Sequence, residues 1–234
     1  AAGDGFKVAL NAAACSAAAT TMPSVLMLVD VLAFYRVTTM TTTTARSTIN
    51  GETFTASSSS GLLLTFTNDW QNYSKVRFTT TTTLPTGLVA GTDYWLIRVS
   101  ATTARVATSF ANAIAGTAIA YTDAGTGTHT MTLRWPRYTN GAGVQAFFVN
   151  TNATALGAGT PNLTLPAYTN AAGTASRVTP SAPSPPIGKT AASNGHILYS
   201  GATGVGKMGP FLPLQAGDAG IQSVQQIENS TSYV

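Results

Sequence analysis

The chain has 234 residues, of which 44% are hydrophobic and 9% are charged, and its net charge is +4. An ordinary soluble domain has about 25% charged residues, so the composition disfavours a freely diffusing cytosolic enzyme, whose solubility depends on surface charge. The twelve Lys and Arg residues stand singly along the chain, and no basic cluster of the kind that binds nucleic acid is present. The composition therefore favours extracellular life or burial in a large assembly.

The cysteine count and the hydropathy pattern exclude further classes of protein. Cys15 is the single cysteine, so neither a disulfide framework nor a thiolate metal site is expected. The longest apolar run, 25–35, contains Asp30 and is shorter than the ~20 residues that cross a bilayer. The first residues carry no basic stretch, so no signal peptide is expected. We therefore predict no membrane partner and expect the protein to leave its cell by lysis.

The first 52 residues divide into three segments. Residues 1–22 are Ala-rich without a polar period, and we predict an extended N-terminal arm. Residues 23–36 are apolar at almost every position, which is compatible with a helix beginning at Pro23 and equally with a buried strand. Residues 37–52 are Thr-rich with little to bury, and we interpret them as a connection.

Residues 53–133 are predicted to form a small antiparallel β module. Short β-like segments alternate with turn signals at 84–87 and 123–127, and the strand candidates are 62–66, 76–78, 92–99, 105–108, 118–119 and 129–133. The clearest is 92–99, which places Tyr94, Leu96 and Arg98 on one face and Trp95, Ile97 and Val99 on the other.

The remainder is predicted to complete a discontinuous main domain, 23–52 and 134–234, with a β-sandwich or jelly-roll-like fold. A turn at Pro136 and 139–141 leads into the apolar run 144–149. Further strand candidates are 162–165, 174–179, 196–200 and 221–227. The Pro/Gly-rich stretches 181–190 and 209–220 are incompatible with regular helix and indicate loops on an all-β scaffold.

No catalytic, cofactor-binding or metal-binding residue is predicted, and we expect a non-enzymatic protein. Residues 201–207 fit the phosphate-loop pattern G-x-x-x-x-G-K, but Met208 replaces the hydroxyl residue that would hold Mg²⁺, and Gly209 and Pro210 prevent the required helix. We interpret them as a glycine-rich hairpin. His129 and His196 lie far apart, without a cluster of acids or cysteine. The eight acids are not paired at short spacing.

Aromatic residues leave two interpretations open. Six rings are compatible with a sugar-stacking surface, although core or interface packing explains each of them more simply; they are Trp70, Trp95, Trp135, Tyr73, Tyr94 and Tyr138.

Two sets of segments resemble bacteriophage proteins. Residues 84–131, with a Leu-Pro turn, a Tyr-aromatic strand and a closing Gly-Thr-Gly-Thr-His, resemble a small β module found in many tailed-bacteriophage structural proteins. Residues 26–36, 137–149 and 210–227 resemble consecutive pieces of a family of uncharacterised phage virion proteins. The first two pieces lie close together in that family but about 100 residues apart here, which fits insertion of the β module into a surface loop.

The resemblance implies a structural protein of the virion. We expect a capsid decoration or cement protein, with the major capsid protein and copies of the chain itself, as a trimer, for partners. The alternative is a tail, baseplate or fibre component whose inserted module binds host-surface glycan.

Overall fold

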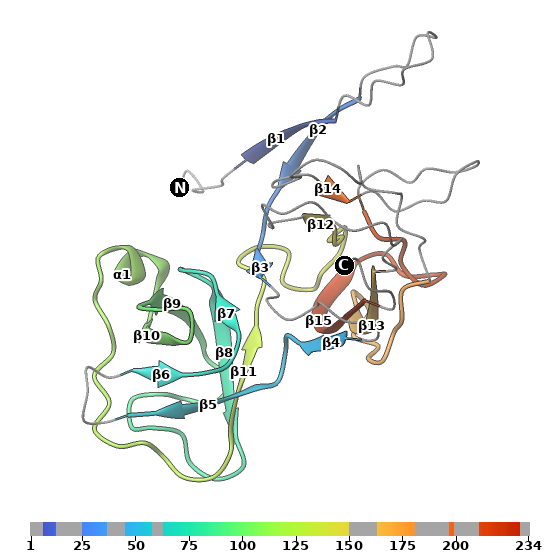
Figure 1. Ribbon diagram of the computed structural model, residues 1–234. Coiled ribbons are helices and arrows are strands. Elements are labelled where there is room, and N and C mark those ends of the chain that lie inside the picture. The colour runs from blue at the N-terminus through green and yellow to red at the C-terminus, as the bar shows by residue number, and fades with distance from the viewer. Residues whose placement is uncertain are drawn as a thin grey trace, which may run out of the picture. The chain divides into compact units, whose positions relative to one another are not determined.

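The computed structural model describes residues 7–12, 25–36, 45–57, 63–149, 163–180, 197–198 and 211–229 (Figure 1). The chain divides into two compact units, Ala1–Phe34 and Tyr35–Val234. The described residues are mainly β, with one short helix among them. The expectation of a mainly-β protein is therefore confirmed.

The first unit contains a two-stranded antiparallel sheet. Strand β1 (Lys7–Ala12) pairs with β2 (Val25–Asp30), and the register runs from Lys7 opposite Asp30 to Ala12 opposite Val25. Within the predicted segment 23–36, β2 and β3 (Tyr35–Arg36, in the second unit) are strands, and residues 31–34 between them are neither strand nor helix. The predicted arm at 1–22 contains a paired strand, because the apolar residues of β2 provide a partner that sequence periodicity does not reveal.

A closed six-stranded barrel occupies residues 52–133 of the second unit (Figure 1). All its pairings are antiparallel and follow the order β10-β6-β5-β11-β8-β9, closed by β9 with β10. The strands are β5 (Glu52–Ala56), β6 (Leu64–Thr65), β8 (Lys75–Thr80), β9 (Asp93–Arg98), β10 (Thr103–Ala107) and β11 (His129–Leu133). Closure leaves no sheet edge exposed for pairing with another chain.

The barrel interior follows the period-2 alternation of its strands. In β9, Tyr94 and Leu96 are 3% and 0% exposed, whereas Trp95 and Ile97 are half-buried. The alternation predicted for 92–99 is correct over these residues. The other strands contribute interior side chains that are at most 4% exposed: Phe54, Leu64, Val76, Phe78, Val106 and Met131.

Four segments of the barrel region differ from the sequence-based expectations. β5 and β7 (Asp69–Trp70) were not predicted. The short helix α1 (Phe110–Ile114) was also missed; its N-cap is Ser109, whose hydroxyl accepts from the Asn112 amide at 3.1 Å. Residues 118–119, predicted as strand, lie outside any strand, and only the Ile119 amide bonds to the barrel, at the Val106 carbonyl.

A three-stranded antiparallel sheet, in the order β13-β15-β4, accompanies the barrel in the second unit. It contains β13 (Leu163–Asn170), β15 (Ile221–Asn229) and β4 (Ala45–Thr48). β4 corrects the interpretation of 37–52 as a mere connection, because β15 supplies the partner for this polar segment. Two smaller pairs are β12 (Phe148–Val149) with β14 (Ile197–Leu198), and β3 with β7.

Two strand candidates of the second half are shorter than predicted. Only 148–149 of the run 144–149 is strand, as β12. The segment 174–179 makes a single bridge, Tyr168 with Arg177. Residues with positive φ lie next to both segments. Gly141 and Gly143 precede the first segment, Gly173 precedes the second, and Ser176 lies within the second.

The chain passes from sheet to barrel and back at one place. On the way in, the Ile49 amide donates to the Gln225 carbonyl of β15 at 2.8 Å, and the Gly51 amide donates to Met131 of β11 at 3.0 Å. The buried Asn50 side chain accepts from the Leu133 amide at 2.5 Å. On the way out, the Trp135 indole donates to the Ile221 carbonyl of β15 at 2.8 Å.

Glu52, at the start of β5, closes this junction from the barrel side. Its side chain is buried, and its carboxylate accepts from the amides of Thr67 and Asn68 at 2.7 Å each and from the Trp70 indole at 2.5 Å. The Trp70 ring packs T-shaped against Tyr35 of β3, with centroids 5.6 Å apart. One acid thus joins the first barrel strand to β7 and, through it, to β3.

Replacing Tyr94 by Ala should destabilise the barrel by about 3–5 kcal/mol, because it removes a fully packed aromatic ring. We expect amide exchange to accelerate in β5, β8, β9 and β11 while β13 and β15 keep their protection. Val99→Ala, at a side chain that is 54% exposed, is the control and should change stability by less than about 0.5 kcal/mol. Equal loss of protection in β13 and β15 would show that 53–133 is not an independent module.

Replacing Glu52 by Gln should cost about 2–3 kcal/mol, because hydrogen bonds to a charged acceptor are lost and an amide NH₂ now faces N–H donors. Chemical denaturation followed by Trp fluorescence measures the change, since Trp70 reports on this contact. An unchanged midpoint would contradict the role given to this carboxylate.

Candidate interaction surface

A belt of six threonines runs around the outside of the barrel. It crosses five of the six strands in two registered rows, because directly opposed residues of antiparallel strands lie on the same face. Thr65 lies opposite both Thr55 and Thr103, and Thr130 lies opposite both Thr53 and Thr79. We call these six residues the threonine belt.

The belt faces outward and carries no charge. Four of its members, Thr53, Thr55, Thr65 and Thr79, are exposed, and the other two are partly exposed. Their immediate neighbours, among them Phe54 and Phe78, fill the barrel interior. The hydroxyls of Thr79 and Thr130 are 2.5 Å apart, so adjacent members hydrogen-bond across strands. Chemically, the belt offers hydroxyl and methyl groups whose burial involves no ion desolvation.

Five charged side chains of the described barrel region pair with one another. Asp93 binds Lys75 at 2.9 Å and Arg77 at 2.6 Å, and Asp69 binds Arg98 at 2.7 Å. Burial opposes ionisation of Asp93, but the hydrogen bonds from Lys75 and Arg77 outweigh it and lower the pKa of this carboxyl. These cations are therefore partly neutralised before any partner approaches.

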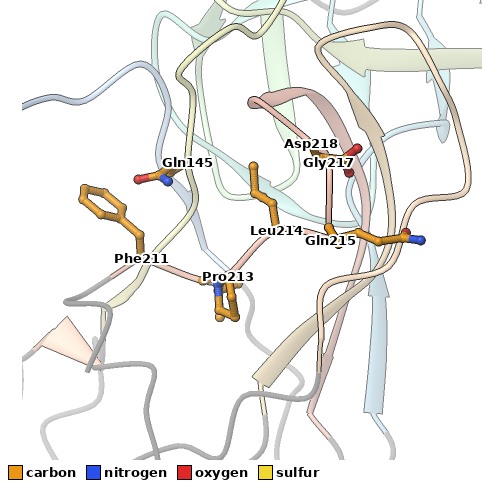
Figure 2. A pocket seen from close by; sticks show the side chains of 9 residues that line it. Gln145, Phe211, Pro213, Leu214, Gln215, Gly217 and Asp218 are labelled. Carbon is orange, nitrogen blue, oxygen red and sulfur yellow. The ribbon is translucent and has the colours of Figure 1, made fainter. Parts of the chain in front are cut away.

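An open groove with a volume of about 260 Å³ lies beside the loop that precedes β15 (Figure 2). It is lined by Gln145 and by residues 211–218, and Phe211 also packs T-shaped against Phe147. Among the lining residues that Figure 2 labels, Asp218 carries the one acidic group.

Asp218 is saturated by partners from neighbouring segments. It accepts hydrogen bonds from the Tyr168 hydroxyl, from Asn170 at 2.7 Å and from Arg177 at 3.0 Å, and its side chain is 2% exposed. The hydrogen bond from Arg177 is the largest cause that lowers the pKa of Asp218 to about 2. Burial, followed by the hydrogen bond to Asp218, raises the pKa of Tyr168. The acid therefore fastens the groove loop to β13 and has no lone pair left for simple ligand chemistry.

Of the residues singled out from the sequence as possible site residues, His129 is packed inside the barrel region, and several others are not described. His129 is buried; its ring lies 5.3 Å from Phe54, with nitrogens near the Thr80 hydroxyl and the Ala124 carbonyl. His196, Cys15 and the loop 201–207 lie outside the described residues. Within the described ranges, no group of three His, Cys, Asp or Glu side chains is placed to hold a metal ion. No helix in those ranges is long and apolar enough to span a membrane.

The six aromatic candidates do not form one surface. Trp70, Trp135 and Tyr94 are at most 9% exposed and belong to the core. Trp95 is half-buried, and Tyr73 and Tyr138 are 39% and 55% exposed. Sequence periodicity missed Phe110, which packs against Tyr73, because a five-residue helix has too few turns to show a period.

Comparison of the chain with protein-family models, with curated proteins and with solved structures finds no match.

The Asp218 contacts predict acid sensitivity. A carboxyl whose folded pKa lies at about 2, below its ordinary 3.8, stabilises the fold above pH 3.8, and that contribution is lost as the pH falls toward 2. We expect the melting temperature to drop over this range, and the drop to be smaller in Asp218→Asn. The parent chain is the reference, and equal slopes for the parent and Asp218→Asn would contradict this assignment.

Proposed function

We propose that the chain is a structural subunit of a bacteriophage particle, a decoration or cement protein that stabilises the capsid shell through subunit contacts. The threonine belt is the observation that carries the proposal. A permanent interface buries about 2,000 Å² or more, and each unpaired charge taken into it is costly. A registered belt without charged residues avoids that cost and retains hydroxyls for hydrogen bonds.

The resemblance of 84–131, 26–36, 137–149 and 210–227 to phage structural proteins supports the same assignment. In this proposal the partners are the major capsid protein and further copies of the chain, arranged as a trimer. The protein has no enzymatic role and resides in the virion.

The proposal also includes a finer domain plan. The main domain, 23–52 and 134–234, is a β-sandwich or jelly-roll-like body, and 53–133 is an inserted β domain. Support comes from the junction, where Glu52 lies opposite Met131 and Asn50 contacts Leu133. Chain ends that meet at one place are what insertion into a surface loop requires.

The runner-up is a tail, baseplate or fibre component whose barrel binds host glycan. The ring pair formed by the exposed Tyr73 and the half-buried Phe110 favours it, because α1, which carries Phe110, packs on barrel strands β9 and β10. Image reconstruction of intact particles that contain the chain separates the two. Hundreds of copies over the head support decoration, whereas a few copies at the tail tip contradict it and support the runner-up.

The threonine belt itself is tested by Thr65→Lys, at the centre of one row. We expect incorporation into particles to fall by at least about tenfold, because an uncompensated charge would be buried in the interface. The melting temperature of the isolated chain should hardly change, since Thr65 is exposed. Ala90→Lys, in an exposed loop outside the belt, is the matched control. Equal incorporation of both variants and the parent chain would reject the belt as an interface.

A further inference from the structure

Tyr73 has a backbone conformation that a bulky residue rarely adopts. Its φ is 65°, in the left-handed region, which costs a residue with a Cβ roughly 1 kcal/mol or more. The residue is nevertheless 39% exposed, so core packing does not explain why an aromatic side chain occupies this turn. Tyr138 has a similar φ of 52°, so the backbone conformation does not by itself single out Tyr73; its contact with a second ring does.

The ring of Tyr73 is held in place by a second aromatic ring. It meets Phe110 of α1 edge to face, with centroids 5.9 Å apart and an interplanar angle of 79°. The Ser109 cap fixes the start of α1, which packs on β9 and β10 (Figure 1). The Tyr73 amide donates to the Leu96 carbonyl of β9 at 2.9 Å. Both rings are therefore pre-positioned, which lowers the entropy cost of binding.

Polar side chains with defined partners, Asn72 and Lys75, flank Tyr73 along the chain. The half-buried Trp95 lies opposite Lys75 in register, and the Lys75 ammonium sits 5.4 Å from the centre of its ring. Asn72, next to Tyr73, accepts from the Arg98 amide at 2.9 Å, which leaves its side-chain NH₂ available for other bonds. Apolar ring faces beside oriented donors and acceptors suit a ligand with one apolar face and many hydroxyls.

The cations of this region are already paired with acids, which favours a neutral ligand over a nucleic acid. Single-stranded nucleic acid also stacks on aromatic rings, but it requires several cations for its phosphates. Here Lys75, Arg77 and Arg98 are each ion-paired to Asp93 or Asp69. Arg105 adds an exposed guanidinium on β10, which is too little for a phosphate backbone.

We propose that Tyr73 and Phe110 form an aromatic platform that binds a neutral glycan by stacking against its sugar rings. The inference deepens the glycan-binding role given above as the runner-up, by naming the ligand class and the residues that contact it, and it does not depend on where in a particle the subunit lies.

The variant Tyr73→Asn tests the aromatic platform, because Asn tolerates the left-handed region and the substitution removes the ring without adding backbone strain. The matched control is Tyr138→Asn, since Tyr138 is also exposed and has a φ of 52°. Among the described residues, no aromatic ring packs against Tyr138. Purified full-length chain is run through native gels that contain dextran, mannan or purified bacterial surface polysaccharides, and through gels that contain oligothymidylate.

We expect at least one polysaccharide to retard the parent chain and Tyr138→Asn equally, and to bind Tyr73→Asn at least about tenfold more weakly. The melting temperature of Tyr73→Asn should stay within a few degrees of the parent. No retardation of the parent chain, equal retardation of Tyr73→Asn, or retardation by oligothymidylate alone would overturn the proposal. Copy number on a particle should be unchanged in Tyr73→Asn, so failure here is distinguishable from failure of the structural role.

Discussion

The buried carboxylate of Glu52 is the contact on which the arrangement of the second unit depends. A carboxylate is expensive to remove from water unless hydrogen-bond donors replace the lost solvent. Three N–H groups do so here, from Thr67, Asn68 and the Trp70 indole. All three belong to the segment between β6 and β8, so the acid ties that segment to the first residue of the barrel. Since Trp70 also packs on Tyr35, the same contact reaches the strand that begins the second unit.

The low fraction of charged residues shapes both this junction and the outer surface. With only 9% charged residues, the chain places several of its acids where they cross-link strands or loops, as Glu52, Asp93 and Asp218 do. The described outer surface of the barrel carries the threonine belt and the exposed Tyr73 beside few charged residues, among them Arg105 and Asp123. Such a surface repels partners weakly and is inexpensive to desolvate, which is the physical basis of both the assembly role and the glycan platform proposed above.

Strands rich in large apolar residues were predictable from sequence. Residues 94–97 are four large apolar residues in a row, residues 129–133 alternate threonine with His129, Met131 and Leu133, and both segments lie in barrel strands. β4 and β5 were not predictable, because Ala45–Thr48 and Glu52–Ala56 are polar or small at most positions. Their pairing comes from β15 and β11, which are distant in sequence. α1 was missed because five residues span little more than one turn.

The candidate surfaces were also predictable from the sequence only in part. Alternation of Thr with Phe, Leu or Met at 53–55, 64–65, 78–79 and 130–132 is visible in the sequence, and it indicates outward-facing threonines. That these threonines stand side by side depends on the registers of four strand pairs, which no local pattern specifies. Likewise, six aromatic residues were identified from composition, but only packing separates the buried Trp70 and Tyr94 from the exposed Tyr73.

By itself, the amino-acid order determined that this protein is built from short strands, that it holds few ions, and which faces of its clearest strands turn inward. These properties follow from local periodicity and composition, which act within a few residues. Tertiary structure alone decided that the strands close into a barrel, that Glu52 finds three donors, and that Tyr73 meets Phe110. Glu52 and Thr67 are 15 positions apart, and Tyr73 and Phe110 are 37 positions apart. Hydrogen-bond satisfaction and close packing of the whole chain select such contacts.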